Sequence, residues 1–394
     1  MKNTWWTNLE DLDVDQEKVL DLPPSGKHVI FGPPGCGKTN LLLLRAKYLY
    51  GKEGFKNILF LTYTGCLADF IRSGLNDQKF FKPDQVQTFW SWARSHISTY
   101  YPQGLADFES LFIKNKDKKI ENSKDNKERK NKILVELLES AYAKAPTHIL
   151  YDAVFIDEAQ DLTKEQIVEL SRLAPVVTIA GDDRQGLYGM DGLSVQGFKS
   201  ITLEYHYRIG KRICEVADKI LPPKDGNNSL LDYCLYSEEK NASDADIFSH
   251  ATRNDQYRAI LDRLQTQLRA FPDELLGVIL PTNGMIEEFK SYLKDSEFFE
   301  ITSFHSDEGV NNSFRSDRPI HVLTIHAAKG TEFRAVHIAG GEEIKFPMNR
   351  REVSFTAITR AKTSLSLHYS GQVMPFIASA FAKTSTITKK DLFS

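Results

Sequence analysis

The stretch Gly-Pro-Pro-Gly-Cys-Gly-Lys-Thr, residues 32–39, decides how this chain folds. It fits the pattern G-x-x-x-x-G-K-[ST]. The apolar run 28–31 in front of it predicts a short buried strand, and residues 40–49 behind it predict a helix. A glycine loop between a strand and a helix N-terminus directs backbone N–H groups at an anion, which the helix dipole also favours. The stretch therefore predicts a phosphate-binding loop in an α/β domain.

The loop and a later carboxylate pair together predict a site for ATP and Mg²⁺. Lys38 is expected to reach the β- and γ-phosphates, and the Thr39 hydroxyl is expected to bind Mg²⁺. The strand-like run 153–157 leads into Asp157 and Glu158. Asp157 would hold Mg²⁺, and Glu158 would orient and deprotonate the attacking water. The bland alternatives are a Gly/Pro turn and an Asp-Glu turn without chemistry. The predicted nucleotide-binding residues of the loop are Gly32, Pro33, Pro34, Gly35, Cys36, Gly37, Lys38, Thr39 and Asn40.

The composition of the chain limits the classes of protein to which it can belong. The chain has 394 residues, of which 41% are hydrophobic and 26% charged, as in a globular protein of two or three domains. A net charge of −3 gives no global attraction to polyanions, so nucleic acid would bind a local groove. The four cysteines include no C-x-x-C pair, which disfavours zinc and disulfides and fits a cytoplasmic location. With no leader-like N-terminus or membrane-length apolar run, we expect no membrane association.

Short apolar runs recur along the chain and predict buried strands separated by helices. This alternation is typical of parallel α/β sheets. The pattern restarts near residue 201, so we predict one domain over 1–200 and a second over 201–394. The predicted strands are 58–63, 153–157 and 176–180 in the first domain, and 276–280, 321–325 and 335–339 in the second.

A basic segment lies within the first domain. Residues 114–132 contain nine Lys or Arg against four acids. The run lies within a predicted insertion at about 95–150. A solvated helix or mobile loop is the favoured interpretation, and a phosphate-contacting arm is the sharper alternative.

Motifs along the whole chain resemble those of one family. Residues 155–162, Phe-Ile-Asp-Glu-Ala-Gln-Asp-Leu, resemble motif II of the UvrD/Rep-type superfamily 1 helicases. The resemblance implies two RecA-like P-loop domains with parallel β-sheets and a small helical insertion in the first. It also indicates a compact member that lacks the large second-domain insertion. The other matching stretches, in family order, are 15–19, 180–188, 205–208, 324–333 and 356–362.

The resemblance implies further contacts to ATP. Gln16 would read the adenine edge, and Tyr207 would stack on the base. Glu332 would bind the ribose, with Gly330 beside it in the same motif.

The same resemblance implies three further catalytic residues. Gln185 would sense the γ-phosphate. Arg208 and Arg360, supplied by the second domain, would act as arginine fingers when the two domains close. Hydrolysis would thereby be coupled to domain closure.

A nucleic-acid track is also implied by the resemblance. Aromatic side chains would stack on bases, and hydroxyl and imidazole groups would bind phosphate oxygens. For any single aromatic, core packing is an equal alternative. Trp90 stands where the family usually has His, and Asp191 stands where it usually has Arg, so the track is altered. Its predicted members are Tyr63, Thr64, Thr88, Trp90, Tyr188, Thr324 and His326.

The predicted function is an ATP-dependent translocase or helicase on single-stranded DNA that moves 3′ to 5′. RNA stays open as the substrate. The altered track motivates an alternative from another class, an ATP-driven nucleic-acid sensor or regulatory subunit of a nuclease or antiviral complex. In that case the partner would be a protein such as a nuclease.

Overall fold

The computed structural model describes residues 9–75, 82–112, 124–185, 190–223, 229–305, 314–315, 317–345 and 349–383. The chain forms two compact units. The first contains Met1–His206, Ser313–Asp317 and Lys329–Thr331. The second contains Tyr207–Asn312, Arg318–Ala328 and Glu332–Ser394.

A six-stranded parallel sheet forms the centre of the first unit, in the order β3-β2-β4-β5-β1-β6. Every residue of β2, β4 and β5 is buried, as expected of parallel strands covered on both faces. The strands are β1 (Gly26–Phe31), β2 (Ile58–Thr62), β3 (Val86–Thr88), β4 (Ala153–Ile156), β5 (Val176–Gly181) and β6 (Lys199–Thr202).

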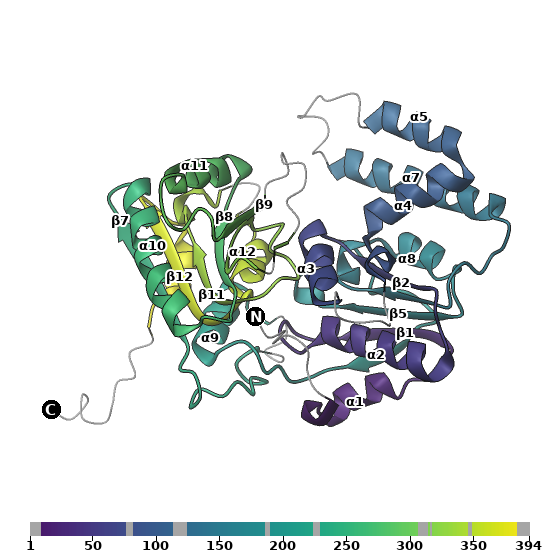
Figure 1. Cartoon of the computed structure of the whole chain (residues 1–394), viewed down its shortest axis with the longest axis horizontal. Coiled ribbons are helices and arrows are strands. Elements are labelled where there is room, and N and C mark those ends of the chain that lie inside the picture. Colours follow the sequence, from purple (N-terminus) through teal and green to yellow (C-terminus); the bar gives the residue numbers. More distant parts are fainter. Residues whose placement is uncertain are drawn as a thin grey trace. The chain divides into compact units, whose positions relative to one another are not determined.

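Helices of the first unit pack on different strands of its sheet. α2 packs on β4 and β5 and also contacts α1, whereas α3 and α4 pack on β2 and β3. Figure 1 shows α4, α5 and α7 grouped together, apart from α1 and α2. The helices are α1 (Val14–Leu20), α2 (Lys38–Glu53), α3 (Gly65–Leu75), α4 (Phe89–Tyr100), α5 (Pro102–Phe112), α7 (Lys124–Lys144) and α8 (Lys164–Leu170).

The second unit has its own six-stranded parallel sheet, in the order β7-β12-β11-β8-β10-β9. β8 is buried throughout, and β12 alternates between buried and partly exposed residues at its start. The strands are β7 (Asp244–His250), β8 (Leu276–Leu280), β9 (Thr302–His305), β10 (Ile320–Thr324), β11 (Phe333–Ile338) and β12 (Ala361–Ser370).

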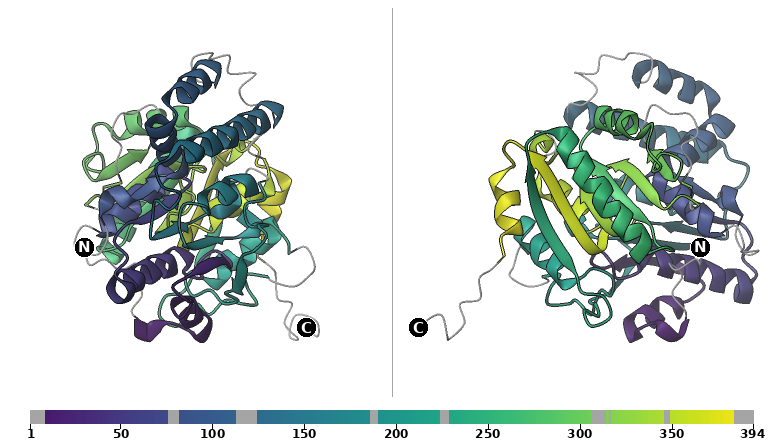
Figure 2. Two further views of the ribbon diagram at one scale, coloured as in Figure 1. Left: turned by 90° about the vertical axis from the view of Figure 1, so that its right-hand side faces the viewer. Right: turned by 60° about the vertical axis from the view of Figure 1, so that its left-hand side comes forward.

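Helices of the second unit pack on this sheet. The long helix α10 runs along β7 and β12, as Figure 2 shows, and α11 contacts β8, β9 and β10. α9 contacts α12, α13, β7 and β12. The helices are α9 (Lys211–Ile220), α10 (Arg253–Ala270), α11 (Asn283–Leu293), α12 (Arg351–Ile358) and α13 (Pro375–Phe381).

The predicted fold class is confirmed: two α/β units each carry a parallel sheet, and a helical insertion lies in the first. Residues 201 and 202, assigned from the sequence to the second domain, form the end of β6 in the first sheet. Of the basic run 114–132, the structure describes only the part from residue 124, which forms the start of α7. Among the described helices, none combines the length and apolarity needed to cross a membrane.

Candidate functional site

The loop between β1 and α2 is organised around Lys38. Its Nζ donates to the carbonyl of Gly32 at 2.7 Å and to that of Pro33 at 2.9 Å. Gly37, the residue before α2, has a left-handed φ of 91°, a conformation that glycine adopts without the steric cost of a side chain. The ammonium group is therefore held against the loop that the sequence predicts to bind phosphate.

Thr39 and Asp157 join this loop to the end of β4. The Thr39 hydroxyl donates to Asp157 Oδ2 at 2.6 Å, and the Glu158 amide donates to Asp157 Oδ1 at 3.0 Å. Asp157 is buried. Burial, reinforced by the neighbouring charge of Glu158, raises the pKa of Asp157 above its ordinary value, although Thr39 and Lys38 oppose the shift. The two predicted metal ligands, Thr39 and Asp157, thus contact each other directly.

Glu158 has an unusual backbone. With φ 55° it is the one non-glycine residue at positive φ within the described ranges. This conformation costs about 1–2 kcal/mol and is found mostly where function keeps it. Its carboxylate accepts a hydrogen bond from the Gln160 amide, and the Gln160 carbonyl in turn accepts from the Asp182 backbone N–H at 3.2 Å. The Glu158 side chain is therefore fixed with respect to the end of β5.

A buried lysine completes the polar cluster of the first unit. Lys329 is 1% exposed, and its Nζ donates to Asp161 Oδ1 and to the Gln185 carbonyl, both at 2.8 Å. The same Nζ lies 3.7 Å from Glu158 Oε2. The Gln185 amide donates to Asp182 Oδ2 at 2.7 Å. Lys329 thus connects the segments that contain Glu158 and Gln185.

Gln16 is held by two contacts, one to the same loop and one to the start of α1. Its Nε2 donates to the Cys36 carbonyl at 3.0 Å, and its Oε1 accepts from the Asp13 amide at 3.1 Å, which closes the capping box of α1. Pro34, Cys36 and Asn40 are buried. Gln16 therefore adjoins the loop as expected, and its adenine-reading role stays a prediction.

The predicted residues of the second unit show two different environments. Arg208 forms an ion pair with Glu332, and Tyr207 beside it is exposed. Arg360 is buried, and its Nε donates to the Thr356 carbonyl at 2.9 Å. The roles predicted for these side chains remain predictions.

Gly330 belongs to the first unit and has a φ of 79°. A Cβ added there would lie 2.4 Å from Leu67 Cδ2, so the backbone approaches α3 closely. The position requires glycine for steric reasons that are independent of any nucleotide contact.

The predicted nucleic-acid residues of the first unit have structural contacts of their own. Tyr63 and Trp90 are half-buried and pack on the core of this unit. Lys130 Nζ lies 4.9 Å from the centre of the Trp90 ring, so the basic helix α7 reaches this aromatic. Thr88 accepts from the Ser91 amide as the N-cap of α4, and the Thr64 hydroxyl donates to the Lys329 carbonyl at 3.3 Å.

The remaining members of the predicted track are Thr324, His326 and Tyr188. Thr324 Oγ1 accepts from the Ala327 amide at 3.2 Å, and His326 is exposed. Tyr188 lies outside the described residues. Binding of nucleic acid by this set remains a prediction.

Four members of the cluster were not among the predicted site residues. Gln160 and Asp161 follow the carboxylate pair, Asp182 follows β5, and Lys329 belongs to the stretch 324–333. All four are buried polar side chains. The signal was available, because each lies inside a motif-like stretch that also contains a predicted site residue.

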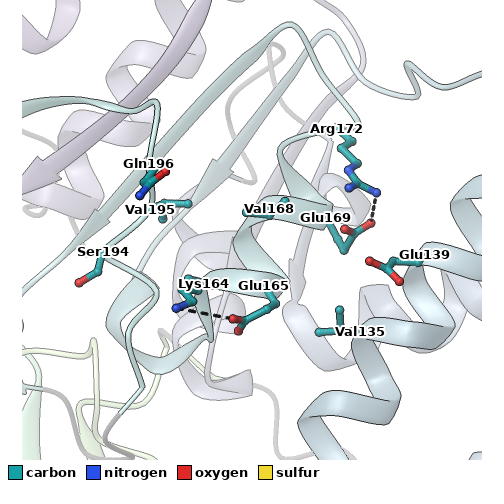
Figure 3. A pocket seen from close by; sticks show the side chains of 10 residues that line it. All are labelled: Val135, Glu139, Lys164, Glu165, Val168, Glu169, Arg172, Ser194, Val195 and Gln196. Carbon is teal, nitrogen blue, oxygen red and sulfur yellow. Dashed lines mark hydrogen bonds and ion pairs between the residues drawn. The ribbon is translucent and has the colours of Figure 1, made fainter.

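A cavity of about 390 Å³ lies elsewhere in the first unit, between α7, α8 and residues 194–196 (Figure 3). None of the sequence-predicted site residues lines it. Its charged side chains include the pairs Lys164–Glu165 and Arg172–Glu169. Its lining residues are Val135, Glu139, Lys164, Glu165, Val168, Glu169, Arg172, Ser194, Val195 and Gln196.

Two family models match the chain. Residues 16–191 match a model described as an AAA domain, and residues 319–368 match one described as the UvrD-like helicase C-terminal domain. The first match includes the phosphate loop and the carboxylate pair, and the second includes Glu332 and Arg360.

Three relatives extend the comparison. The chain is 21% identical over 460 aligned positions to a probable DNA helicase of Mycoplasma pneumoniae, an alignment that covers 91% of this chain and 83% of that protein. It is 22% identical over 334 positions to DNA helicase II of Haemophilus influenzae, covering 64% and 45%. It is 35% identical over 94 positions to the ATP-dependent DNA helicase Rep of Buchnera aphidicola, covering 21% and 13%. The resemblance inferred from the motifs is confirmed.

Proposed function

The family matches and the helicase relatives make this chain a UvrD/Rep-type superfamily 1 helicase, and from this premise we propose that the cluster around Lys38, Thr39 and Asp157 is its site of ATP hydrolysis. The enzyme is then an ATP-dependent DNA helicase. The observation that carries the assignment is the 2.6 Å hydrogen bond between Thr39 and Asp157, which unites the phosphate loop with the carboxylate pair.

The residues fit ATP and Mg²⁺. Hydroxyl and carboxylate oxygens are the ligands that Mg²⁺ prefers, and Thr39 and Asp157 would supply them. Burial raises the pKa of Asp157, so a bound cation would stabilise the charged form of this carboxylate. Mg²⁺, when bound, neutralises charge on the phosphate oxygens. Lys38 would exchange its two loop carbonyls for phosphate oxygens.

Within this proposal, Glu158 takes a proton from the attacking water. Gln160 and Lys329 hold the carboxylate in place, and Gln185 senses the γ-phosphate. Arg208 and Arg360 act as arginine fingers and couple hydrolysis to closure of the two RecA-like domains. Arginine fingers in other phosphoryl-transfer enzymes contribute about 10³–10⁵ in rate.

The finer substrate assignment is movement on single-stranded DNA in the 3′ to 5′ direction. The relatives carry helicase names, which favours a motor over the nucleic-acid sensor. A nuclease partner and a cytoplasmic location remain predictions.

Steady-state ATP hydrolysis with and without single-stranded DNA tests the proposal, with Lys38→Ala as the inactive control. We expect DNA to stimulate hydrolysis and Lys38→Ala to abolish it. Strand displacement on duplexes with a 3′ or a 5′ single-stranded tail then tests direction. Hydrolysis that DNA leaves unchanged, or that survives Lys38→Ala, would refute the assignment.

A further inference from the structure

Five charged side chains form a connected chain within the second unit. Lys362 is at its centre, with Nζ 3.1 Å from Glu332 Oε1 and 3.9 Å from Glu274 Oε2. Glu332 uses its other oxygen, Oε2, to pair with Arg208. Glu274 uses its other oxygen, Oε1, to pair with Arg334 Nη1 at 3.6 Å. Each carboxylate thus lies between two cations.

The sheet explains why these groups meet. Glu332 directly precedes β11, and Lys362 is the second residue of β12. These strands are parallel neighbours, with Phe333 opposite Ala361, so their first residues lie side by side. Glu274 precedes β8, the strand on the other side of β11. The start of three adjacent strands therefore gathers the charges, and Lys362 is the cation between the two carboxylates.

We propose that Lys362 is a positioning residue that keeps Glu332 from closing a two-point ion pair around Arg208. This inference rests on the proposed function, in which Arg208 serves ATP hydrolysis, and on the prediction from the family resemblance that Glu332 binds the ribose. Arginine and a carboxylate readily form two parallel hydrogen bonds, and such a pair is stronger than a single contact. Lys362 occupies Oε1 of Glu332 and leaves one oxygen for Arg208. Without the ammonium group of Lys362, both oxygens of Glu332 become available to the guanidinium group of Arg208. Arg208 then stays paired with Glu332 instead of serving ATP hydrolysis.

The charge of Lys362 should therefore matter for turnover. Burial, together with the charges of Arg208 and Arg334, lowers the pKa of Lys362 to about 8 against the opposing effect of Glu274. The charged groups that face the ammonium are Arg208, Arg334, Glu274 and Glu332. The ammonium is present below pH 8 and lost as the pH rises through that value. An arginine at this position would keep its charge throughout this range.

The test uses the full chain and the DNA-stimulated ATPase between about pH 6.5 and 9.5. We expect Lys362→Met to lower kcat by about 10–100-fold, the scale of a displaced reacting group, with KM for ATP changed much less. The wild-type kcat should fall above pH 8, and Lys362→Arg should keep its activity without that fall. Lys290→Met is the matched control, because Lys290 is a lysine of the same unit whose side chain is 45% exposed and lies 3.8 Å from Glu287.

Two outcomes would overturn the inference: wild-type kcat in Lys362→Met, or the same alkaline fall in Lys362→Arg. If Lys362→Arg is active and Lys362→Met is not, the loss of activity comes from the missing charge and not from a general folding defect. Arg208→Ala separates this inference from the proposed function. If Arg208→Ala is slow but Lys362→Met is normal, only the positioning role is wrong. If Arg208→Ala itself turns over normally, the assigned role of Arg208 in hydrolysis is wrong.

Discussion

Replacing Lys329 with methionine tests the polar cluster of the first unit most directly. The lysine is 1% exposed, and the side chain of its partner Asp161 is completely buried. The ammonium lies 2.7 Å from Asp161 Oδ2 and donates to the Gln185 carbonyl at 2.8 Å. Methionine matches the length of the lysine stem but supplies neither charge nor donor. The substitution therefore leaves a buried carboxylate without its cation.

The magnitude follows from this burial. Breaking a buried pair by removing one partner costs about 3–5 kcal/mol, because the remaining charge is neither hydrated nor paired. Typical domains are stable by only about 5–15 kcal/mol, so the first unit would lose a large part of its margin. The double variant Lys329→Met/Asp161→Leu removes both charges, and replacing a whole buried pair by apolar groups is often nearly neutral. We therefore expect the double variant to be more stable than either single one.

Tryptophan fluorescence during urea unfolding measures this loss selectively. Of the four tryptophans, Trp90 and Trp92 belong to the described part of the first unit, and the sequence of the second unit contains none. Lys164→Met is the matched control, because Lys164 is an exposed lysine of the same unit, 3.6 Å from Asp191. Exposed pairs of this kind contribute about 0–1 kcal/mol. The control should therefore shift the midpoint very little.

A loss of less than about 1 kcal/mol in the free energy of unfolding of Lys329→Met, the value of an exposed pair, would contradict this prediction. It also fails if the losses of the two single variants simply add in the double variant. Additivity would mean that the two charges do not depend on each other. Either result would show that the ammonium and the carboxylate are hydrated despite their burial.

Three further predictions address catalysis and pH. Glu158→Gln should bind ATP but not hydrolyse it, measured by nucleotide binding and phosphate release; wild-type turnover would remove Glu158 from its role as base. Arg360→Ala should slow hydrolysis with little change in ATP affinity, and an unaltered rate would remove it from the site. Burial lowers the pKa of His337 to about 3 and that of His368 to about 2, so the unfolded chain takes up these protons first as the pH falls below about 6.5. The contribution of the two neutral histidines to the free energy of unfolding is complete above about pH 6.5. Below that pH it falls by about 1.4 kcal/mol per histidine and pH unit. Urea unfolding followed by far-ultraviolet circular dichroism at several pH values should therefore show a weaker acid dependence for His337→Gln than for the wild type.

Features set by local sequence were predictable. Residues 32–37 precede α2, whose first two residues are Lys38 and Thr39, and the apolar run 276–280 is strand β8 with the same bounds. Asp157 and Glu158 follow β4, where the sequence analysis places them. In each case a few neighbouring residues determine the structure, through glycine conformations or through an unbroken apolar run.

Strands built from polar residues were not predictable in this way. β12 has the sequence Ala-Lys-Thr-Ser-Leu-Ser-Leu-His-Tyr-Ser, yet Ser366 and His368 within it are fully buried. Two rings of β7 stack on His368, with centres 5.3 Å (Phe248) and 5.2 Å (His250) from its own. β12 is also an inner strand of the sheet, with β7 on one side of it and β11 on the other. Tertiary packing, rather than hydrophobic periodicity, makes this segment a strand.

The polar cluster of the first unit could be predicted only in part, for a related reason. Lys329 and Asp161 are 168 residues apart in the sequence, and no local pattern indicates that they pair. Their pairing also bears on Glu158, which has a strained backbone and lies 3.7 Å from the same ammonium. A strained residue persists only when its surroundings fix it, and Gln160 and Lys329 both contact its carboxylate. The sequence motif therefore predicts Glu158 as the base that we propose, whereas a lysine distant in the sequence contacts its carboxylate.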